Sequence, residues 1–495
     1  MKLKELASQL LICQLIGEET TEISGIATDS RQVRPGDLFV CVPGFVSDGH
    51  DFAPKAVELG AAALVTERKL ELDVPQLIVK DARYAMSVLS ACVYGYPSRK
   101  MKVIGITGTN GKTTTSYLVE HILRDQGFRT GLMGTISAKI GSEFTPMERT
   151  TMEASDLQRT FGLMADEGTD YCVMEVSSHA LDLGRVKGVR FRGAVFTNLT
   201  QDHLDYHETM DKYEAAKGLL FSRMGNEFTG DAGDKQYAVL NADDPSADRL
   251  AKLTAAEVIT YGVNRDCDVR ASNIRITAKG TEFDVVSFAG TEPMRMKLVG
   301  LFNVYNALAA ISVSLAEGLS LSQIRESLGS MPGVDGRMEI VDEGQEFLVL
   351  VDYAHTPDGL RNALGSIREF AQGRIRCVFG CGGDRDRTKR PLMGKVTGEL
   401  SDDVYVTSDN PRTEDPGAIL LDIVPGLVEA GLDESRYKLL VDRPEAIQKA
   451  IEEAGPHDVV LIAGKGHETY QDIAGVKHDF DDRLIARAAL RRLHS

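Results

Sequence analysis

The chain has 495 residues, of which 43% are apolar and 26% charged, a composition typical of a soluble globular protein of about three domains. The net charge of −17 argues against non-specific binding to nucleic acid or to anionic membranes, although a local basic pocket can still hold phosphates. The seven cysteines are scattered and odd in number, which fits a reducing compartment. The apolar run 10–16 is too short to span a bilayer. We therefore expect a cytoplasmic protein with no nucleic-acid partner and no membrane insertion.

The first predicted domain covers residues 1–98. Short apolar runs at 37–42 and 62–65 are strand candidates, and proline–glycine and aspartate–glycine turns lie between them. Residues 96–100, with the sequence Tyr-Pro-Ser-Arg-Lys, are predicted to form the linker to the next domain.

The second predicted domain covers residues 99–335. A strand at 103–107 leads through a glycine-rich turn into an amphipathic helix that Gly127 is expected to stop. Further strands are predicted at 171–176, 193–197 and 237–240, and a helix at 304–317, before a boundary near 333–336. Strands that alternate with helices predict a mainly parallel sheet covered by helices.

The third predicted domain covers residues 336–495 and has the same alternation. Strands are expected at 347–351, 376–379, 404–407 and 459–462, and each is followed by glycine and polar residues. Ligands of open α/β sheets bind beyond the carboxyl ends of the strands. The whole chain is thus predicted to be an α/β protein of three domains, the central one a P-loop domain and the last one Rossmann-like.

The glycine-rich turn of the second domain predicts a phosphate-binding loop. Its residues are Gly108, Thr109, Asn110, Gly111, Lys112, Thr113 and Thr114. Glycines let backbone N–H groups approach phosphates, Lys112 can neutralise the β- and γ-phosphates, and the hydroxyl of Thr113 can hold Mg²⁺. Because Ile106 replaces the first glycine of the usual pattern, the loop is a G-x-x-G-K-T variant, and an ordinary strand–helix turn is the alternative. The prediction is ATP with Mg²⁺.

Motifs spread along almost the whole chain resemble those of the Mur ligases, which build the peptide stem of peptidoglycan. Besides the phosphate loop they occupy residues 29–31, 175–179, 198–207, 216–221, 303–306, 352–355, 382–385, 409–412 and 464–468. The resemblance is to the branch that adds meso-diaminopimelate to UDP-N-acetylmuramoyl-L-alanyl-D-glutamate. It implies a peptide synthase of cytoplasmic peptidoglycan precursor synthesis. ATP phosphorylates the D-glutamate carboxylate, and an amine of diaminopimelate attacks the acyl phosphate, releasing phosphate beside ADP. We further expect a monomer.

The resemblance also assigns catalytic and nucleotide-binding residues. The catalytic set is Lys112, Glu175, His203 and Lys217, and the Mg²⁺ ligands are Thr113, Glu175, His203 and a carbamylated Lys217. Further ATP contacts are Asn303, Asn306 and Arg337, with Asp352, Tyr353 and His355 contributing. The alternatives are a structural histidine for His203, a solvated helical lysine for Lys217, and helix-capping amides for the two asparagines.

Contacts to the two other substrates follow from the same resemblance. The UDP-linked substrate is expected at Ser30, Thr150, Thr151, Ser177 and Arg185, and at the loop 44–47. Diaminopimelate is expected at Arg385, Asp409, Asn410, Pro411, Arg412, Gly464 and Glu468. A guanidinium binds a carboxylate through two hydrogen bonds, so Arg412 favours diaminopimelate, which carries a distal carboxylate that lysine lacks. A rigid turn at 409–412 is the alternative.

Two other functions are alternatives to a Mur ligase. A folylpolyglutamate synthase shares the central and C-terminal architecture, but it lacks the N-terminal uridine domain and the Asp-Asn-Pro-Arg motif. A non-catalytic P-loop module would have lost some of Lys112, Glu175, His203 and Lys217, and all four are present.

Overall fold

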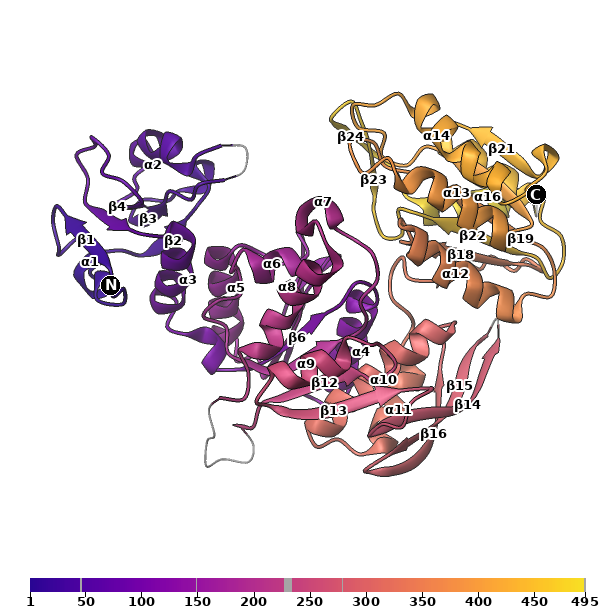
Figure 1. The fold of residues 1–495 in the computed structure, drawn as a ribbon, viewed down its shortest axis with the longest axis horizontal. Helices are drawn as coiled ribbons and strands as arrows, with labels where there is room; N and C mark the ends of the chain where they lie inside the picture. The colour runs from indigo at the N-terminus through magenta and orange to yellow at the C-terminus, as the bar shows by residue number, and fades with distance from the viewer. Residues whose placement is uncertain (45–46, 148, 227–233, 278, 494–495) are drawn as a thin grey trace.

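The computed structural model describes residues 1–44, 47–147, 149–226, 234–277 and 279–493. Figure 1 shows three α/β bodies that follow one another along the chain, with the central body between the N-terminal and C-terminal ones. Their sheets have five, eleven and six strands, and a two-stranded hairpin joins the last body. The fold class predicted from the sequence, a three-body α/β protein with mainly parallel sheets, is confirmed.

The N-terminal body is a five-stranded sheet in the order β1-β5-β4-β3-β2. Its elements are α1 Leu3–Ala7, β1 Cys13–Ile16, β2 Gly25–Ala27, β3 Asp37–Val40, α2 Ala53–Glu58, β4 Ala63–Thr66, β5 Gln76–Val79 and α3 Ala82–Val93. The stretch 96–100, predicted to be a linker, contains the packed 3-10 turn η3 Pro97–Arg99. Within it the buried Ser98 accepts a hydrogen bond from the Arg190 backbone N–H at 3.1 Å. The connection is therefore fixed against the central body.

The central body has an eleven-stranded sheet in the order β16-β15-β14-β13-β12-β11-β6-β10-β7-β8-β9. Its strands are β6 Lys102–Thr107, β7 Thr130–Met133, β8 Ser137–Ile140, β9 Glu143–Pro146, β10 Tyr171–Glu175, β11 Phe191–Phe196, β12 Tyr237–Asn241, β13 Glu257–Gly262, β14 Val269–Thr277, β15 Gly280–Ser287 and β16 Gly290–Met296. Its helices are α4 Lys112–Asp125, α5 Ala154–Asp166, α6 Ser178–Asp182, α7 Leu204–His207, α8 Met210–Ser222, α9 Ala247–Leu253, α10 Leu301–Ala316 and α11 Leu321–Ser330. Strands β7, β10, β6, β11, β12, β13 and β14 run parallel.

The antiparallel end of this sheet, β14 to β16, is absent from the strands predicted above. The exposure of β14 nevertheless alternates along its length, as a strand with one covered face requires. Its polar outer residues made the segment look less regular than the buried parallel strands.

The C-terminal body has the strand order β17-β18-β22-β19-β20-β21, and β17 is its antiparallel strand. Its strands are β17 Glu339–Ile340, β18 Leu348–Asp352, β19 Ile375–Phe379, β20 Asp403–Thr407, β21 Tyr437–Leu440, β22 Val459–Ala463 and the hairpin β23 Tyr470–Ile473 and β24 Val476–Asp479. Its helices are α12 Pro357–Phe370, α13 Lys389–Leu400, α14 Pro416–Glu429, α15 Arg443–Glu452 and α16 Asp482–Leu493. Among the residues described, no helix is long and apolar enough to cross a bilayer.

Sheet order decides which loops meet. In the central body β10, β6 and β11 are adjacent and parallel, so the residues after their carboxyl ends lie together. In the C-terminal body the adjacent parallel strands β18, β22, β19 and β20 bring four polar segments to one edge of the sheet.

Candidate active site at the junction of the central and C-terminal bodies

The phosphate loop connects β6 to α4. Gly111 has φ +85°, and a Cβ built on it would lie 2.3 Å from Oδ1 of Asn306, so this position requires glycine. Asn198, just beyond β11, accepts the backbone N–H of Asn110 at 2.9 Å. The neighbouring strand end thus supports the loop, and the N-terminus of α4 supplies the positive end of a helix dipole to an anion.

Glu175 ends β10 beside this loop and is almost fully buried. Its Oε1 accepts the hydroxyl of Thr113 at 3.0 Å and the backbone N–H of Thr135 at 2.8 Å, and its Oε2 accepts the Thr135 hydroxyl at 3.0 Å. A carboxylate and a hydroxyl are donors that Mg²⁺ prefers. The predicted ligands Thr113 and Glu175 are therefore brought together, and Thr135 is a supporting residue that the sequence analysis missed.

Two lysines, the half-buried Lys112 and the buried Lys217, converge on the phosphate loop. Nζ of Lys112 donates to the backbone carbonyls of Gly108 and Thr109 at 2.9 and 2.8 Å. Nζ of Lys217, from α8, donates to the same Gly108 carbonyl at 2.8 Å and lies over the ring of Tyr213. Burial lowers the pKa of Lys112 and holds that of Lys217 well below its usual range. Lys217 is thus a buried residue of the site, and the alternative of a solvated lysine is wrong.

His203 begins α7 with a left-handed backbone, φ +54°. Its side chain is 46% exposed, yet partial desolvation by the surrounding protein lowers the pKa of its imidazole to about 4, despite the adjacent Asp202 carboxylate. A neutral imidazole is the form that binds metals. Asp202, which the sequence analysis did not single out, also pairs with Lys389 of the C-terminal body at 3.0 Å.

A cavity of about 640 Å³ unites these residues with the C-terminal body. Arg337 lines it, donates to the Thr113 hydroxyl at 3.3 Å and stacks on the ring of Tyr353. Further lining residues are Asp352, Tyr353, His355 and Asp358, which joins the set although the sequence analysis missed it. Asp358 accepts Nδ2 of Asn110 at 2.7 Å, so a carboxylate of the C-terminal body contacts the phosphate loop directly.

The two asparagines of α10 differ in their positions. Asn306 lines the cavity and accepts the Thr115 hydroxyl at 3.3 Å. Asn303 lies behind it, fully buried; its Nδ2 donates to the Val299 carbonyl at 2.9 Å, and its Oδ1 accepts Nδ2 of Asn306 at 3.0 Å. In this structure Asn306 faces the nucleotide cavity and Asn303 holds Asn306 in place.

The residues expected at the UDP-linked substrate form a second group beside Glu175. Thr151 donates to the Glu175 carbonyl at 2.9 Å and accepts the Ser177 backbone N–H at 3.1 Å. Arg185 donates to the Thr151 carbonyl at 3.2 Å. Thr150 hydrogen-bonds with the Thr135 hydroxyl at 3.1 Å, which ties this group to the Thr113–Glu175 pair.

The N-terminal body holds the remaining residue of that set. Ser30 is buried at the start of the 3-10 turn η1 Ser30–Gln32, apart from the residues that line the 640 Å³ cavity. The accompanying loop 44–47 falls partly on residues 45–46, which lie outside the described residues.

The residues expected at diaminopimelate meet at the carboxyl edge of the C-terminal sheet. Gly464 follows β22 with φ +121°, and a Cβ on it would lie 2.6 Å from Oδ2 of Asp409. Asn410 donates to Oε2 of Glu468 at 2.9 Å. Arg412 donates to the Gly383 carbonyl at 2.5 Å, and its backbone has φ +51°. The segment 409–412 therefore gathers with residues 383, 464 and 468 at this edge of the sheet, and we refer to this cluster, the expected diaminopimelate site, as the amino-acid pocket.

Two further features complete this pocket. Arg385 is exposed and donates to the Asp384 carbonyl at 3.1 Å; with Gly382 it lies close to Arg412. Lys465, which the sequence analysis quoted within a motif without a role, is fully buried between Asn410 and Glu468. A lysine between two glycines after an apolar strand was the signal in the sequence.

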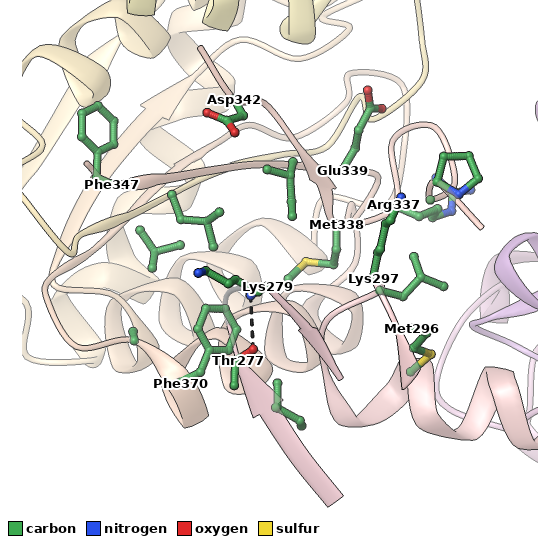
Figure 2. A pocket seen from close by; sticks show the side chains of 18 of the residues that line it. Thr277, Lys279, Met296, Lys297, Arg337, Met338, Glu339, Asp342, Phe347 and Phe370 are labelled. Atoms are coloured by element: carbon green, nitrogen blue, oxygen red, sulfur yellow. Dashed lines mark hydrogen bonds between the residues drawn. The ribbon is translucent and has the colours of Figure 1, made fainter. Parts of the chain in front are cut away.

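A second cavity, of about 1130 Å³, lies on another face of the same junction. Figure 2 shows it between the ends of β14 and β16 and the segment that enters the C-terminal body, with Met296, Met338, Phe347 and Phe370 around it. Lys279, Lys297, Glu339 and Asp342 give its rim charges of both signs. Of the predicted site residues, Arg337 alone lines both cavities.

Comparisons with known proteins agree with this architecture. Family models match residues 22–101 (Mur ligase family, catalytic domain), 106–314 (Mur ligase middle domain) and 336–466 (Mur ligase, glutamate ligase domain). A relative from Geobacillus thermodenitrificans is 51% identical over 491 residues, 99% of each chain, and one from Bacillus licheniformis is 49% identical over 494 residues, 100% of each chain. Both are named UDP-N-acetylmuramoyl-L-alanyl-D-glutamate–2,6-diaminopimelate ligase.

Comparisons with solved structures also find Mur ligases. A structure of a UDP-N-acetylmuramoyl-L-alanyl-D-glutamate–2,6-diaminopimelate ligase is 33% identical with a TM-score of 0.71, covering 100% of this chain and 99% of that one. A Mycobacterium tuberculosis folylpolyglutamate synthase complexed with ADP has a TM-score of 0.62 at 18% identity, covering 83% and 93% of the two chains. The second likeness concerns the fold alone.

Proposed function

The chain belongs to the Mur ligase family, and we propose that it joins meso-diaminopimelate to the D-glutamate of UDP-N-acetylmuramoyl-L-alanyl-D-glutamate at the expense of ATP. The observation that carries the proposal is that relatives named for this reaction match the whole chain at 49% and 51% identity. The geometry supports it, because one cavity is lined both by a phosphate loop and by residues of the body that holds the amino-acid pocket.

The first step is transfer of the γ-phosphoryl group of ATP to the D-glutamate carboxylate. A carboxylate oxygen forms a bond to the γ-phosphorus, the bond to the β-phosphate oxygen breaks, and ADP leaves. Such reactions depend on positioning and on cations that offset developing negative charge. The loop N–H groups, the N-terminus of α4, Lys112 and Arg337 provide that environment.

The donor set at the strand ends fits Mg²⁺. The Thr113 hydroxyl and the Glu175 carboxylate, 3.0 Å apart, would hold one ion, and the neutral imidazole of His203 with a modified Lys217 would hold another. Bound Mg²⁺ would neutralise the phosphoryl oxygens.

Lys217 meets the chemical requirement for carbamylation. A neutral amine is the nucleophile that adds to CO2, and burial holds the pKa of Lys217 far below its usual range. Formation of the N–C bond with loss of a proton turns the side chain into an anion. That anion can bind a divalent cation where an ammonium could not.

The second step forms the amide bond. An amine of diaminopimelate attacks the carbonyl carbon of the acyl phosphate, the C–O bond to phosphate breaks, and the nitrogen loses a proton. Arg412 with Arg385 would bind carboxylate and Glu468 an ammonium of this substrate. Thr150, Thr151, Ser177 and Arg185 would hold the muramoyl-dipeptide, with Ser30 toward the uridine diphosphate.

The test is phosphate release from ATP, measured with the UDP-dipeptide, with diaminopimelate, and with both. Ligation predicts release that requires both substrates and matches the amide formed. Release with folate and glutamate would favour a folylpolyglutamate synthase instead. ATP binding without any substrate-dependent release would favour a non-catalytic nucleotide-binding module.

We also infer a cytoplasmic monomer. Mean mass from light scattering should equal the 53.9 kDa of one chain, and a dimer mass would contradict the monomer. Cell fractionation tests the location independently.

A further inference from the structure

Lys465 is a fully buried cation at the edge of the amino-acid pocket. It follows β22 and stands between Gly464 and Gly466, which have φ +121° and +52°. Its Nζ donates to Oδ1 of Asn410 and to Oε2 of Glu468, each at 3.0 Å. A buried ammonium is costly unless it is paired and hydrogen-bonded, so these two contacts are the reason that it can be buried here.

The surroundings of Lys465 are shaped for this arrangement. The rings of Tyr470 and Phe480 lie 5.5 and 5.9 Å from Nζ and favour a cation. A Cβ on Gly466 would lie 2.8 Å from Cβ of Tyr353, so the backbone after the lysine needs glycine. The lysine is therefore held in one position.

The two carboxylate oxygens of Glu468 differ in their hydrogen bonding. Oε2 accepts both Nζ of Lys465 and Nδ2 of Asn410, the latter at 2.9 Å. Oε1 accepts no hydrogen bond from any residue in the described parts of the chain, and the side chain remains 18% exposed. Asn410 is fixed in turn, since its Oδ1 also accepts the Asp472 backbone N–H at 2.9 Å. The network leaves one carboxylate oxygen available to a ligand.

We propose that Lys465 is a positioning and specificity residue of the amino-acid pocket. It fixes Oε2 of Glu468 so that Oε1 can accept the distal ammonium of the substrate, and it offsets the charge of that carboxylate. With Arg412 nearby, the pocket then suits an end that carries both an ammonium and a carboxylate. A substrate end that carries an ammonium alone, as in lysine, gains less binding free energy. This inference rests on the proposed function.

The decisive variant is Lys465→Met, which keeps the length of the side chain and removes its charge. The KM for diaminopimelate should rise about tenfold, because a charged hydrogen bond within the pocket is lost. Saturating kcat and the KM values for ATP and the UDP-dipeptide should stay within about twofold. The kcat/KM for lysine should rise, because the unpaired Glu468 attracts a lone ammonium.

Lys477→Met is the matched control. Lys477 is exposed on β24 and lies over the same Tyr470 ring at 4.2 Å, outside the Asn410–Glu468 network. Lys477→Met should leave all five of these constants unchanged. An unchanged diaminopimelate KM in Lys465→Met, or an equal rise for all three substrates, would overturn the inference.

A double-mutant cycle with Glu468→Gln tests whether Lys465 acts through Glu468. The combined loss should be clearly smaller than the product of the two single losses, whereas independent effects would contradict the proposal. If Lys465→Met does not fold, Lys465→Gln takes its place; it keeps amide donors without the charge and should still raise the diaminopimelate KM several-fold. An unchanged KM there would also overturn the proposal.

Failure of this inference is distinguishable from failure of the proposed function. A wild-type protein that does not ligate diaminopimelate removes the proposed function. A wild-type protein that does so, with variants of Lys465 that behave like Lys477→Met, removes the role of Lys465 alone.

Discussion

The phosphate-loop site and the amino-acid pocket both hold lysines with low exposure, but the lysines of the two sites have different partners. Lys112 and Lys217 donate to backbone carbonyls, and within the described chain neither has a carboxylate within 4.0 Å. Lys465 instead forms an ion pair with Glu468. The two lysines of the central site therefore have no ion-pair partner, whereas the lysine of the C-terminal pocket has one.

We attribute the difference to the ligand proposed for each site. An ammonium that loses its hydration without gaining an ion pair destabilises the free protein, and such a cost is tolerated where an anion arrives later. ATP phosphates are such an anion. A pocket for a zwitterionic end needs both signs fixed in place, so its lysine is paired in advance.

The largest expected effect is at Lys112. Lys112→Met should lower kcat by about 10²–10³, the usual cost of removing one transition-state charge stabiliser. Because the half-buried Lys112 ammonium has no ion pair, the Tm should stay equal or rise. Near-normal turnover would contradict the assignment of Lys112 to the ATP phosphates. A large drop in Tm would contradict the view that Lys112 has no stabilising ion pair.

Lys217→Ala tests the second lysine that has no ion-pair partner. Ligation should be lost and partly restored by added acetate or formate, because a small anion can replace the carbamate. Lys212→Ala on the same helix, an exposed residue paired with Glu208, is the control and should remain active. Wild-type activity in Lys217→Ala would mean that no essential carbamate forms.

Variants of Arg412 test the amino-acid pocket, in which Lys465 is paired with Glu468. Arg412→Ala or Arg412→Lys should raise the diaminopimelate KM roughly tenfold or more, since a charged hydrogen bond is worth about 1.5–3 kcal/mol. The efficiency with lysine should change little, in contrast to its rise in Lys465→Met. Arg387→Ala, which removes an exposed arginine paired with Glu414, serves as control. An unchanged ratio of the two efficiencies would leave residues 409–412 as a rigid turn only.

The smallest effect concerns pH. Since the pKa of Lys112 is lowered in the folded protein, the unfolded chain binds more protons between that pKa and the usual lysine value near 10.5. Folding stability should therefore rise with pH through this window. The Tm advantage of Lys112→Met over wild type should shrink as the pH approaches 10. A difference in Tm that is independent of pH would contradict the pKa shift.

Structural features that depend on residues close together in the sequence could be predicted. The phosphate loop is a strand, a glycine turn and a helix start within about a dozen positions, and its backbone requirements are visible in residue type. The predicted strands lie within one or two residues of the observed ones, for example 171–176 against β10, whereas the parallel strands β2, β5, β7, β13 and β21 were not predicted. The antiparallel strands β14 to β16 were missed, because their polar outer faces dilute the apolar pattern.

The sequence by itself determined the fold class, the phosphate loop and the family resemblance, because these depend on local hydrogen bonding, periodicity and ordered motifs. Only the tertiary structure decided that Lys217 reaches the Gly108 carbonyl, that Asn303 stands behind Asn306, that Asp358 contacts Asn110, and that Lys465 pairs with Glu468. Two of these four contacts, Lys217 to Gly108 and Asp358 to Asn110, depend on the packing of elements or bodies that are far apart in the chain. Whether a buried charged side chain has an ion-pair partner depends on this packing, and the sequence around the residue does not show it.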